Sequence, residues 1–556
     1  MSEFPVLTLP ALLETTVRQH ANRPVVAFVG EEPIIYADFF SKTKAVSALL
    51  EKLGVQPGDR VALLSANMPN WGITYFAIVS VGAVVVPLLP DFSGEEIKNV
   101  LRHSRSIAIF VSQELLSKLT SLNIHSLKYK IDIEGFKLLE EGAETGFDEN
   151  AVPAKTYTVR EEDLAAIIYT SGTTGKSKGV MLTHKNIAFN VVQGSTIRKI
   201  TDKDRFLSVL PLSHTYENTI GFILPLSHGA CIYYLKKAPS PSVLLPAFQE
   251  VKPTFMLTVP LIIEKIYRAK ILPAFMDKKL MKKLYGKPFF RKQLNRMAGK
   301  KLLKTFGGEL TFFGIGGARI NEQVEKFLLE AKFPYAVGYG LTETAPLLAA
   351  FGPEEARLQA AGKVLEGVEM KIHNPDKTTG EGEVWARGPN VMKGYYKEPE
   401  LTAQVLTEDG WFRTGDLGIL DKEGYLHIRG RSKNVIIGPG GENIYPEEIE
   451  SVINNFKHVV ESLVIEQKGK LVALVHFDKD EIEKKYNEIK EGVSGYVENF
   501  YNELSADLKK YINSRVSRFS KIQRIIPQNE EFIKTATKKI KRFLYYEKTE
   551  GNGERV

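Results

Sequence analysis

Short apolar runs alternate with amphipathic segments along much of this chain, and this alternation constrains the fold most strongly. A short, bounded apolar run predicts a buried strand, and apolar residues recurring every three or four positions predict a helix. We expect strands at 60–67, 83–90 and 106–112, and helices at 37–52 and 95–103. Strands that alternate with helices form largely parallel sheets. The sequence therefore predicts an α/β fold.

The chain changes character at residues 381–430. The strand candidates there are short and bounded by glycine, which is typical of antiparallel strands joined by tight turns. We expect a small β-barrel-like subdomain over 381–430. It would belong to a large N-terminal domain, residues 1–430, built from stacked mixed α/β sheets.

A second domain is predicted from 431 to 556, because 556 residues are too many for one compact core. A helix is expected at 445–455, where a proline stands just inside its start. A strand is expected at 471–477, and residues 480–513 have a charged, helical pattern. This combination predicts a small α+β C-terminal domain.

One cysteine, Cys231, rules out an internal disulfide and favours a reducing compartment. It stands in a strand-like apolar run and is expected to be a small core residue. The longest apolar stretch, 75–90, is shorter than the roughly 20 residues of a membrane-spanning helix. A buried helix that continues into a buried strand is the better interpretation. No signal peptide pattern opens the chain, so a cytoplasmic protein is predicted.

The net charge of +8 and the isoelectric point of about 9.0 favour acidic partners. Such partners include anionic lipid, phosphorylated cofactors, an acidic carrier protein and nucleic acid. No zinc-finger spacing and no aromatic–glycine RNA-binding signature occurs, so we expect no nucleic acid partner.

The segment 261–304 concentrates this charge, with large apolar residues between its lysines and arginines. Two interpretations are equally favoured. The segment could lie on an anionic membrane, which would place the protein peripherally on the inner membrane surface. Alternatively, amphipathic helices could pack on the core and leave a basic face in solvent. The same face could also dock an acidic acyl carrier protein.

A loop rich in hydroxyls and glycine follows the strand-like run LAAIIYT. Hydroxyls and glycine-freed backbone N–H groups can cradle phosphate oxygens, and Lys176 and Lys178 add positive charge. Alone, such a run is more often a flexible surface loop. It is not a P-loop, because that motif needs a glycine five residues before Gly175, where Thr170 stands.

The full run 169–180, YTSGTTGKSKGV, resembles the phosphate loop of the adenylate-forming superfamily, which includes acyl-CoA synthetases, luciferases and peptide-synthetase adenylation domains. Further segments are similar in the expected order between residues 30 and 545. PLSHTYE at 211–217 and GGENIYP at 440–446 resemble the long-chain fatty acyl-CoA synthetase branch.

The resemblance implies a nucleotide site. Tyr339 would stack on adenine, Thr342 would contact the α-phosphate, Glu343 would hold Mg²⁺, and Asp416 would accept the ribose hydroxyls. Without the resemblance, YGLTET at 339–344 is a turn with a helix-capping threonine, and Asp416 belongs to a common Gly-Asp turn. The implied ATP- or AMP-binding residues are Thr170, Ser171, Gly172, Thr173, Thr174, Gly175, Lys178, Gly317, Ala318, Tyr339, Gly340, Thr342, Asp416, Arg431 and Lys539.

The resemblance also assigns roles within a mobile C-terminal domain. Lys433 would be the hinge, and Lys539, in TATKKIKR, the catalytic lysine, although that run alone suggests a basic solvated tail. Many relatives have a lysine where this chain has Ile437. If that lysine takes part in thioester formation in those relatives, this chain lacks the group at that position. The loop on the CoA side would contain Gly440, Gly441 and Glu442.

On the acyl side, His214 would sit by the reacting carboxylate and Glu217 at the tunnel wall, although a lone histidine is more often structural. No HExxH motif or cysteine cluster indicates another metal site. The implied activity is ATP-dependent activation of a fatty acid through an acyl-adenylate, followed by transfer to coenzyme A. Its cofactors and co-substrates would be ATP, Mg²⁺ and coenzyme A. The alternatives are an acyl-carrier-protein ligase and a non-catalytic relative that binds acyl or nucleotide ligands.

Overall fold

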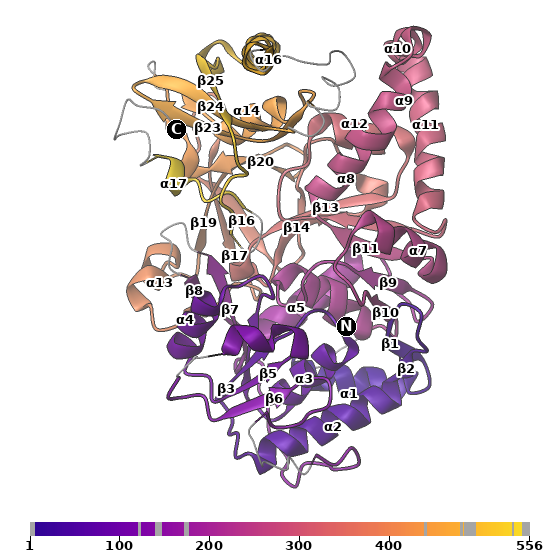
Figure 1. The fold of residues 1–556 in the computed structure, drawn as a ribbon. Coiled ribbons are helices and arrows are strands. Elements are labelled where there is room, and N and C mark those ends of the chain that lie inside the picture. Colours follow the sequence, from indigo (N-terminus) through magenta and orange to yellow (C-terminus); the bar gives the residue numbers. More distant parts are fainter. Residues whose placement is uncertain are drawn as a thin grey trace.

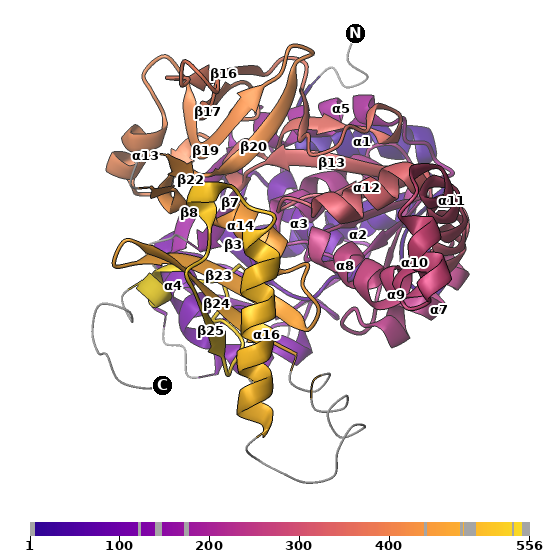
Figure 2. The same cartoon turned by 90° about the horizontal axis from the view of Figure 1, so that it is seen from above.

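The computed structural model of this chain describes residues 6–120, 124–139, 147–171, 177–438, 442–478, 482, 496–535 and 539–546. Figure 1 shows a large body formed by the chain up to about β20, and a smaller C-terminal unit, orange to yellow, above it. The view from above in Figure 2 shows the same unit lying across one side of the body.

The largest sheet joins thirteen strands of the described residues in one ladder. From β13 to β1 its neighbours are parallel, and from β13 to β16 they are antiparallel. In order across the sheet, its strands are β16 (Glu369–His373), β17 (Gly382–Arg387), β19 (Phe412–Leu420), β20 (Tyr425–Arg431), β15 (Gly362–Val364), β14 (Leu347–Phe351), β13 (Tyr335–Gly340), β12 (Phe312–Ile315), β11 (Phe255–Thr258), β9 (Arg205–Ser208), β10 (Cys231–Tyr234), β1 (Pro24–Phe28) and β2 (Ile34–Ile35).

A second sheet of the described chain has seven strands, with a parallel centre. The strands predicted at 60–67, 83–90 and 106–112 are confirmed as β3, β4 and β5. The order across this sheet is β18 (Gly394–Tyr395), β8 (Ser177–Thr183), β7 (Leu164–Ser171), β4 (Val84–Leu88), β3 (Arg60–Leu64), β5 (Ala108–Val111) and β6 (Tyr129–Asp132).

Helices cover both faces of these sheets. The helices predicted at 37–52 and 95–103 are confirmed as α2 and α4, the latter opened by a Ser93–Glu96 capping box. The helices of the large body are α1 (Leu9–His20), α2 (Tyr36–Lys52), α3 (Pro69–Ser80), α4 (Gly94–Ser104), α5 (His184–Ile197), α6 (Leu224–Leu226), α7 (Pro241–Val251), α8 (Pro260–Ile266), α9 (Leu272–Met276), α10 (Lys279–Tyr285), α11 (Pro288–Thr305), α12 (Glu322–Ala331) and α13 (Pro399–Val405).

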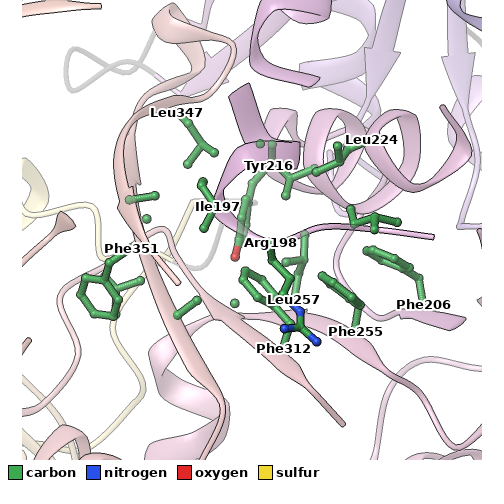
Figure 3. A pocket seen from close by; sticks show the side chains of 18 residues that line it. Ile197, Arg198, Phe206, Tyr216, Leu224, Phe255, Leu257, Phe312, Leu347 and Phe351 are labelled. Atoms are coloured by element: carbon green, nitrogen blue, oxygen red, sulfur yellow. The ribbon is translucent and has the colours of Figure 1, made fainter. Parts of the chain in front are cut away.

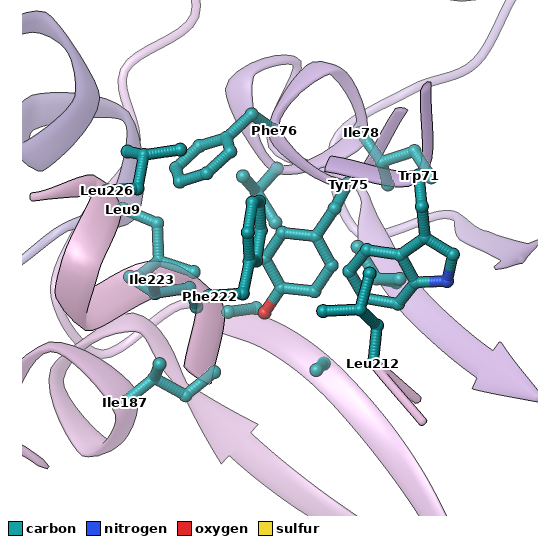
Figure 4. Close-up of a cluster of buried hydrophobic side chains, with 14 of the residues drawn as sticks. Leu9, Trp71, Tyr75, Phe76, Ile78, Ile187, Leu212, Phe222, Ile223 and Leu226 are labelled. Carbon is teal, nitrogen blue, oxygen red and sulfur yellow. The ribbon is translucent and has the colours of Figure 1, made fainter. Parts of the chain in front are cut away.

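The main core lies between the two sheets. Successive residues of a strand face opposite sides. In β3, Val61 and Leu63 accordingly join the cluster that includes β1 and α1–α3, while Ala62 and Leu64 face α4. Figure 4 shows the aromatic centre of this cluster, where Trp71 and Tyr75 stack with ring centroids 5.3 Å apart. The apolar run 75–90 is thus the end of α3 followed by β4, as predicted.

The α/β fold class is confirmed, and the strands expected within 381–430 are antiparallel. Their connection differs from the expected barrel-like unit. β20 pairs with β15, so these strands continue the largest sheet, and no closed barrel is formed among the described strands. Cys231 is buried in β10, as predicted.

The C-terminal unit has its own core. Its elements are β21 (Ile436–Ile437), β22 (Asn443–Ile444), α14 (Pro446–Ile453), β23 (Val459–Gln467), β24 (Lys470–Phe477), α16 (Tyr496–Asn513), β25 (Arg524–Gln528) and α17 (Phe543–Tyr546). They include the predicted helix at 445–455 and strand at 471–477. Within the described ranges, its apolar clusters contain only residues of 436–546, and the other clusters contain only residues up to 428.

No helix of the described residues is both long enough and apolar enough to cross a bilayer.

Candidate active site

The turn after β13 brings the first group of predicted residues together. Gly340 has no room for a side chain, because a Cβ there would lie 1.8 Å from the Pro346 carbonyl oxygen. The Thr344 hydroxyl accepts a hydrogen bond from the Leu341 N–H at 3.0 Å and so closes the turn. The capping threonine expected in YGLTET is therefore Thr344, and Thr342 and Glu343 remain partly exposed.

Asp416 is the most firmly held group of this site. The antiparallel pairing of β19 with β20 puts it opposite Arg431, whose Nε lies 2.8 Å from Oδ1. The Tyr339 hydroxyl donates to Oδ2 at 2.7 Å. Burial raises the pKa of the Asp416 carboxyl, against the opposing effects of the Arg431 charge and the Tyr339 hydrogen bond. Each carboxylate oxygen keeps a lone pair that could accept a ligand hydroxyl.

Glu343 and Lys178 both contact Tyr395, a residue that the sequence did not indicate. The Tyr395 hydroxyl donates to Glu343 Oε1 at 2.9 Å, and Lys178 Nζ lies 5.0 Å from the centre of the Tyr395 ring. Tyr395 reaches this position because β18 pairs with β8. A carboxylate held by one neutral donor still has oxygen lone pairs for a hard cation such as Mg²⁺.

Lys539 joins the site from the C-terminal unit. Its backbone is held by the Thr535 hydroxyl, which accepts from the Lys539 N–H at 3.2 Å. Its side chain is exposed to solvent. Desolvation by the surrounding atoms and the charge of Arg431 lower the pKa of the Lys539 ammonium, while Asp416 and Glu343 act in the opposite sense. Residues far apart in the sequence are thus gathered around one ammonium group.

His214 lies within electrostatic reach of Lys539. Burial and the positive charge of Lys539 lower the pKa of His214 to about 4. The Tyr216 backbone N–H donates to Nδ1 at 3.3 Å. Since Nδ1 accepts, the proton of the neutral ring is on Nε2. His214 is therefore a neutral donor near pH 7 and not a second cation.

A narrow apolar cavity of about 40 Å³ opens beside Tyr216 (Figure 3). On one side, Phe206, Phe255 and Phe312 stack in sequence, with ring centroids 4.7 and 5.1 Å apart. Arg198 is the charged residue at the lining. The other lining residues are Gly194, Ile197, Ile200, Ile220, Leu224, Leu257, Gly314, Ala336, Val337, Gly338, Leu347, Ala350 and Phe351.

The glycines at and just after the end of β12 give Tyr216 its place. A Cβ on Gly316 would lie 3.0 Å from the Tyr216 ring, and one on Gly314 would lie 2.9 Å from its hydroxyl oxygen. The glycines therefore let this ring lie directly on the backbone. Gly317 has a φ of +84°, and Gly317 and Ala318 are exposed at the following turn.

Glu217 is a buried acid in the π-helical turn η2 (Glu217–Ile223), which also supplies Ile220 to the cavity. The Ser208 hydroxyl donates to its Oε1 at 2.5 Å. Oε2 is also buried and has no hydrogen-bond partner among the described residues. Burial raises the pKa of Glu217 to about 8, so the side chain is mostly neutral at pH 7.

Several predicted residues lie outside the described part of the chain: Gly172, Thr173, Thr174, Gly175, Gly440 and Gly441. Thr170 and Ser171 end β7, where Thr170 pairs with Lys178. Lys433 is exposed in the single turn η6 (Ser432–Asn434), directly after Arg431. Ile437 is 62% exposed, and Glu442 precedes β22.

The C-terminal unit touches the rest of the molecule through polar groups. Arg319 Nη1 lies 2.9 Å from Glu448 Oε1, and the Asn321 amide donates to the Ser451 hydroxyl at 3.1 Å. The Tyr445 hydroxyl donates to Glu381 at 2.7 Å. These contacts hold the unit where Lys539 reaches the other site residues.

Two residues of this region were missed by the sequence analysis, Tyr395 and Tyr216. Tyr395 belongs to a short GYY run that carries no recognisable chemistry. Tyr216 stands within PLSHTYE, two residues after His214, and that motif was the only available signal.

Comparison with other proteins finds chains of named activity that are similar over most of their length. A long-chain-fatty-acid–CoA ligase of Drosophila melanogaster, heimdall, is 28% identical over 81% of this chain and 73% of its own length. The long-chain-fatty-acid–CoA ligase FadD15 of Mycobacterium bovis is also 28% identical, over 84% of each chain.

The fold is shared with o-succinylbenzoate CoA synthetase from Bacillus subtilis, solved in complex with ATP and magnesium ion. The TM-score is 0.75 at 24% identity, over 96% of this chain and 98% of the other. A family model described as AMP-binding enzyme matches residues 13–396, well over half of the chain. The chain therefore belongs to the family of AMP-binding enzymes, the adenylate-forming superfamily that its motifs resemble.

Proposed function

We propose that this enzyme is an AMP-forming fatty acyl-CoA ligase for long-chain substrates, with an N-terminal domain over 1–430 and a mobile C-terminal domain over 431–556. The observation that carries the proposal is the position of Lys539. This lysine lies within electrostatic reach of Asp416, Glu343 and His214. That position suits a cation that must neutralise a carboxylate and a phosphate at the same time.

In the first half-reaction, a carboxylate oxygen of the fatty acid attacks the α-phosphorus of ATP. The bond between that phosphorus and the bridging oxygen of the β-phosphate breaks, and pyrophosphate leaves. Lys539 would stabilise negative charge at the α-phosphate and hold the carboxylate in line. Neutral His214 would donate a hydrogen bond from Nε2 without competing with Lys539 for the anion.

The nucleoside would be held by groups that are already ordered. Asp416 would accept the ribose hydroxyls with the lone pairs that Tyr339 and Arg431 leave free, and the Tyr339 ring would lie against adenine. Thr342 would contact the α-phosphate. The hydroxyls and N–H groups of Thr170–Gly175, together with Lys178, Gly317, Ala318 and Gly340, would complete the ATP site.

Glu343 is the proposed Mg²⁺ ligand, since its partly exposed carboxylate has lone pairs beyond its single Tyr395 hydrogen bond. When bound, the ion would supply charge neutralisation for the phosphates. Tyr395 would orient the carboxylate, and Lys178 would add a second positive group beside it.

In the second half-reaction, the thiolate of coenzyme A attacks the acyl carbon of the adenylate. The bond from that carbon to the phosphate oxygen breaks, and AMP leaves. Rotation about Lys433 would withdraw Lys539 and bring Gly440, Gly441 and Glu442 to the adenylate. The polar contacts of Arg319 and Asn321 with α14 would break in this step.

A fatty substrate is supported by the cavity beside Tyr216 and by the names of the relatives. The lining is aromatic and aliphatic, and a buried methylene gains about 0.8 kcal/mol. A cavity of about 40 Å³ must widen to admit a long chain, so the Ile220 and Leu224 side chains of η2 and α6 would have to move.

The decisive experiment is pyrophosphate release across a panel of carboxylates, from acetate to palmitate and including aryl acids, with and without coenzyme A. The expected result is the highest kcat/KM with long-chain fatty acids and thioester formation only with coenzyme A. If the enzyme formed a thioester with holo acyl carrier protein in preference to coenzyme A, the acyl acceptor would be the carrier protein and not coenzyme A. Absence of pyrophosphate release with every acid would refute the catalytic assignment.

A further inference from the structure

The positive charge of this chain is concentrated in one segment. Residues 261–304 contain fourteen lysines and arginines and two acids, a formal charge of +12 against +8 for the whole chain. The remaining residues therefore carry −4. Such segregation indicates a surface with an anionic partner rather than a generally basic protein.

Helices α10 and α11, here called the basic hairpin (279–305), form the outermost part of this segment. They pack against each other and stand at the edge of the molecule, away from the C-terminal unit, in both views (Figures 1 and 2). The hairpin has no acidic residue. Its exposed basic residues are Lys279, Lys282, Lys283, Lys287, Lys292, Arg296, Lys300, Lys301 and Lys304.

The inner face of the basic hairpin is built into the protein. Arg291 forms a bidentate pair with Glu330 of α12, with an Nη2–Oε1 distance of 2.7 Å, and the Asn295 amide donates to the same carboxylate at 2.8 Å. A Cβ on Gly299 would lie 2.8 Å from the Ala331 Cβ, so the two helices touch there. The hairpin therefore has a fixed orientation and a defined outer face.

That outer face exposes large apolar side chains among the lysines. Leu280 is 70% exposed, Phe289 and Met297 are each 69% exposed, and Phe290 is 43% exposed. Phe289 and Met297 are about two helical turns apart on α11. Exposing such large apolar side chains to water is energetically unfavourable, and burying them in another apolar environment would relieve this.

We propose that the outer face of the basic hairpin docks on an anionic lipid bilayer, with Leu280, Phe289 and Met297 entering the interface and the lysines meeting lipid phosphates. The basic side chains favour a bilayer over an acidic protein. Eight of the nine exposed basic residues are lysines, and lysine is depleted at protein interfaces, which favour arginine. A flexible ammonium needs no fixed partner geometry, which suits a fluid layer of phosphates.

The position of the hairpin in the chain gives this docking a use. The hairpin lies between β11 and β12, and Phe255 and Leu257 of β11 and Phe312 of β12 line the apolar cavity. A substrate that partitions into bilayers would thus be concentrated beside the strands that form its proposed pocket. The docking itself does not depend on the proposed catalysis.

The test is flotation of the full-length protein with phosphatidylcholine vesicles, with and without phosphatidylglycerol. Binding is expected only to the anionic vesicles and falls as salt rises. Each lysine near an anionic surface contributes about fivefold to binding. The affinity of the variant K279E/K282E/K283E/K287E for anionic vesicles is therefore expected to fall by more than about a hundredfold. The affinity of L280S/F289S/M297S is expected to fall by about tenfold.

A matched control has the same change of charge elsewhere. K155E/K203E/K377E/K422E replaces four exposed lysines outside the hairpin and is expected to bind nearly as the parent does. Equal loss in this control would overturn the proposal. So would equal binding to neutral and anionic vesicles, or binding to an acidic carrier protein but to neither vesicle. Flotation needs no turnover, so its outcome and that of the pyrophosphate assay are independent.

Discussion

The two ends of the candidate site are built in opposite ways. At the proposed nucleotide end, each polar group is fixed by another: Tyr339 and Arg431 hold Asp416, and Tyr395 holds Glu343. At the proposed acyl end, the wall consists of stacked rings, aliphatic side chains and glycines, with few directional contacts. Tyr216 belongs to the second wall, and Lys539 lies within electrostatic reach of the first group.

This difference separates chemistry from selectivity. Charge-assisted contacts depend on position to within a few tenths of an ångström, so single changes at the nucleotide end have large effects. Apolar contacts are non-directional, and one methylene discriminates by about 1–3 kcal/mol. Changes at the acyl end are therefore expected to alter which acid is used more than how fast phosphate chemistry occurs.

The largest effect is expected for Lys539→Ala. Removing the ammonium should reduce adenylate formation by about 10³-fold, because the charge on the reacting groups loses its stabilisation. The measurement is carboxylate-dependent ATP–pyrophosphate exchange. Transfer to coenzyme A from a synthetic acyl-adenylate should remain within about threefold of the parent, and Lys541→Ala is the matched control. Equal loss of both half-reactions would show that Lys539 has a structural role instead.

Glu343→Gln is expected to reduce adenylation by about 10² at fixed Mg²⁺, since a metal carboxylate is replaced by a weaker neutral ligand. Raising the Mg²⁺ concentration should restore part of the rate. Tyr395→Phe, which removes only the hydrogen bond to Glu343, should reduce the adenylation rate less than Glu343→Gln does. Neither variant should alter the ratio of long-chain to short-chain rates. Glu400→Gln, at an exposed position, is the control. If Glu343→Gln had the same Mg²⁺ dependence as Glu400→Gln, the assignment of Glu343 as a metal ligand would be contradicted.

Gly194→Ala tests the acyl end. A Cβ at this position would lie 2.9 Å from a Leu224 methyl and 3.5 Å from one of Ile220, so it narrows the cavity. The ratio of kcat/KM for a long-chain acid to that for a short one should fall by about fivefold. The affinity for ATP should not change. Gly286→Ala, at the end of α10, provides a Gly→Ala control outside the cavity. An unchanged ratio would place the acyl chain elsewhere.

The smallest effect is a pH dependence of stability from Glu217. Its pKa is about 8 in the folded protein and near 4.5 in the unfolded chain. Between these values the folded state holds a proton that the unfolded state has lost, so its contribution to stability is full below pH 4.5 and is lost as the pH rises toward 8. Glu217→Gln should therefore raise the unfolding temperature above pH 8 by about 2 °C and flatten this profile. Parallel profiles for the two proteins would show that the acid is already ionised.

The periodic elements of the fold were predictable, and the associations between them were not. Strands β3, β4 and β5 and helices α2 and α4 follow from local patterns of apolar residues. The continuation of β17, β19 and β20 into the largest sheet depends on the pairing of β15 with β20, which joins residues distant in the sequence. No local pattern contains that information.

The same division applies to the site. Tyr339, Glu343, Asp416 and Lys539 stand in motifs that carry their chemistry, and the structure brings them together. Tyr395 reaches Glu343 only because β18 pairs with β8, and its own sequence surroundings show nothing unusual. The raised pKa of Glu217 likewise depends on burial, which follows from the packing of η2 and not from the motif.

The polar contact between the two parts of the molecule has a thermodynamic consequence. The Arg319 and Glu448 side chains are 38% and 39% exposed, and an ion pair open to solvent contributes about 0–1 kcal/mol. No apolar cluster of the described residues includes side chains from both sides of the interval 428–436. Separation of the parts would expose little hydrocarbon, so its heat-capacity change is expected to be small. The equilibrium between docked and undocked forms should then respond more strongly to ionic strength than to temperature.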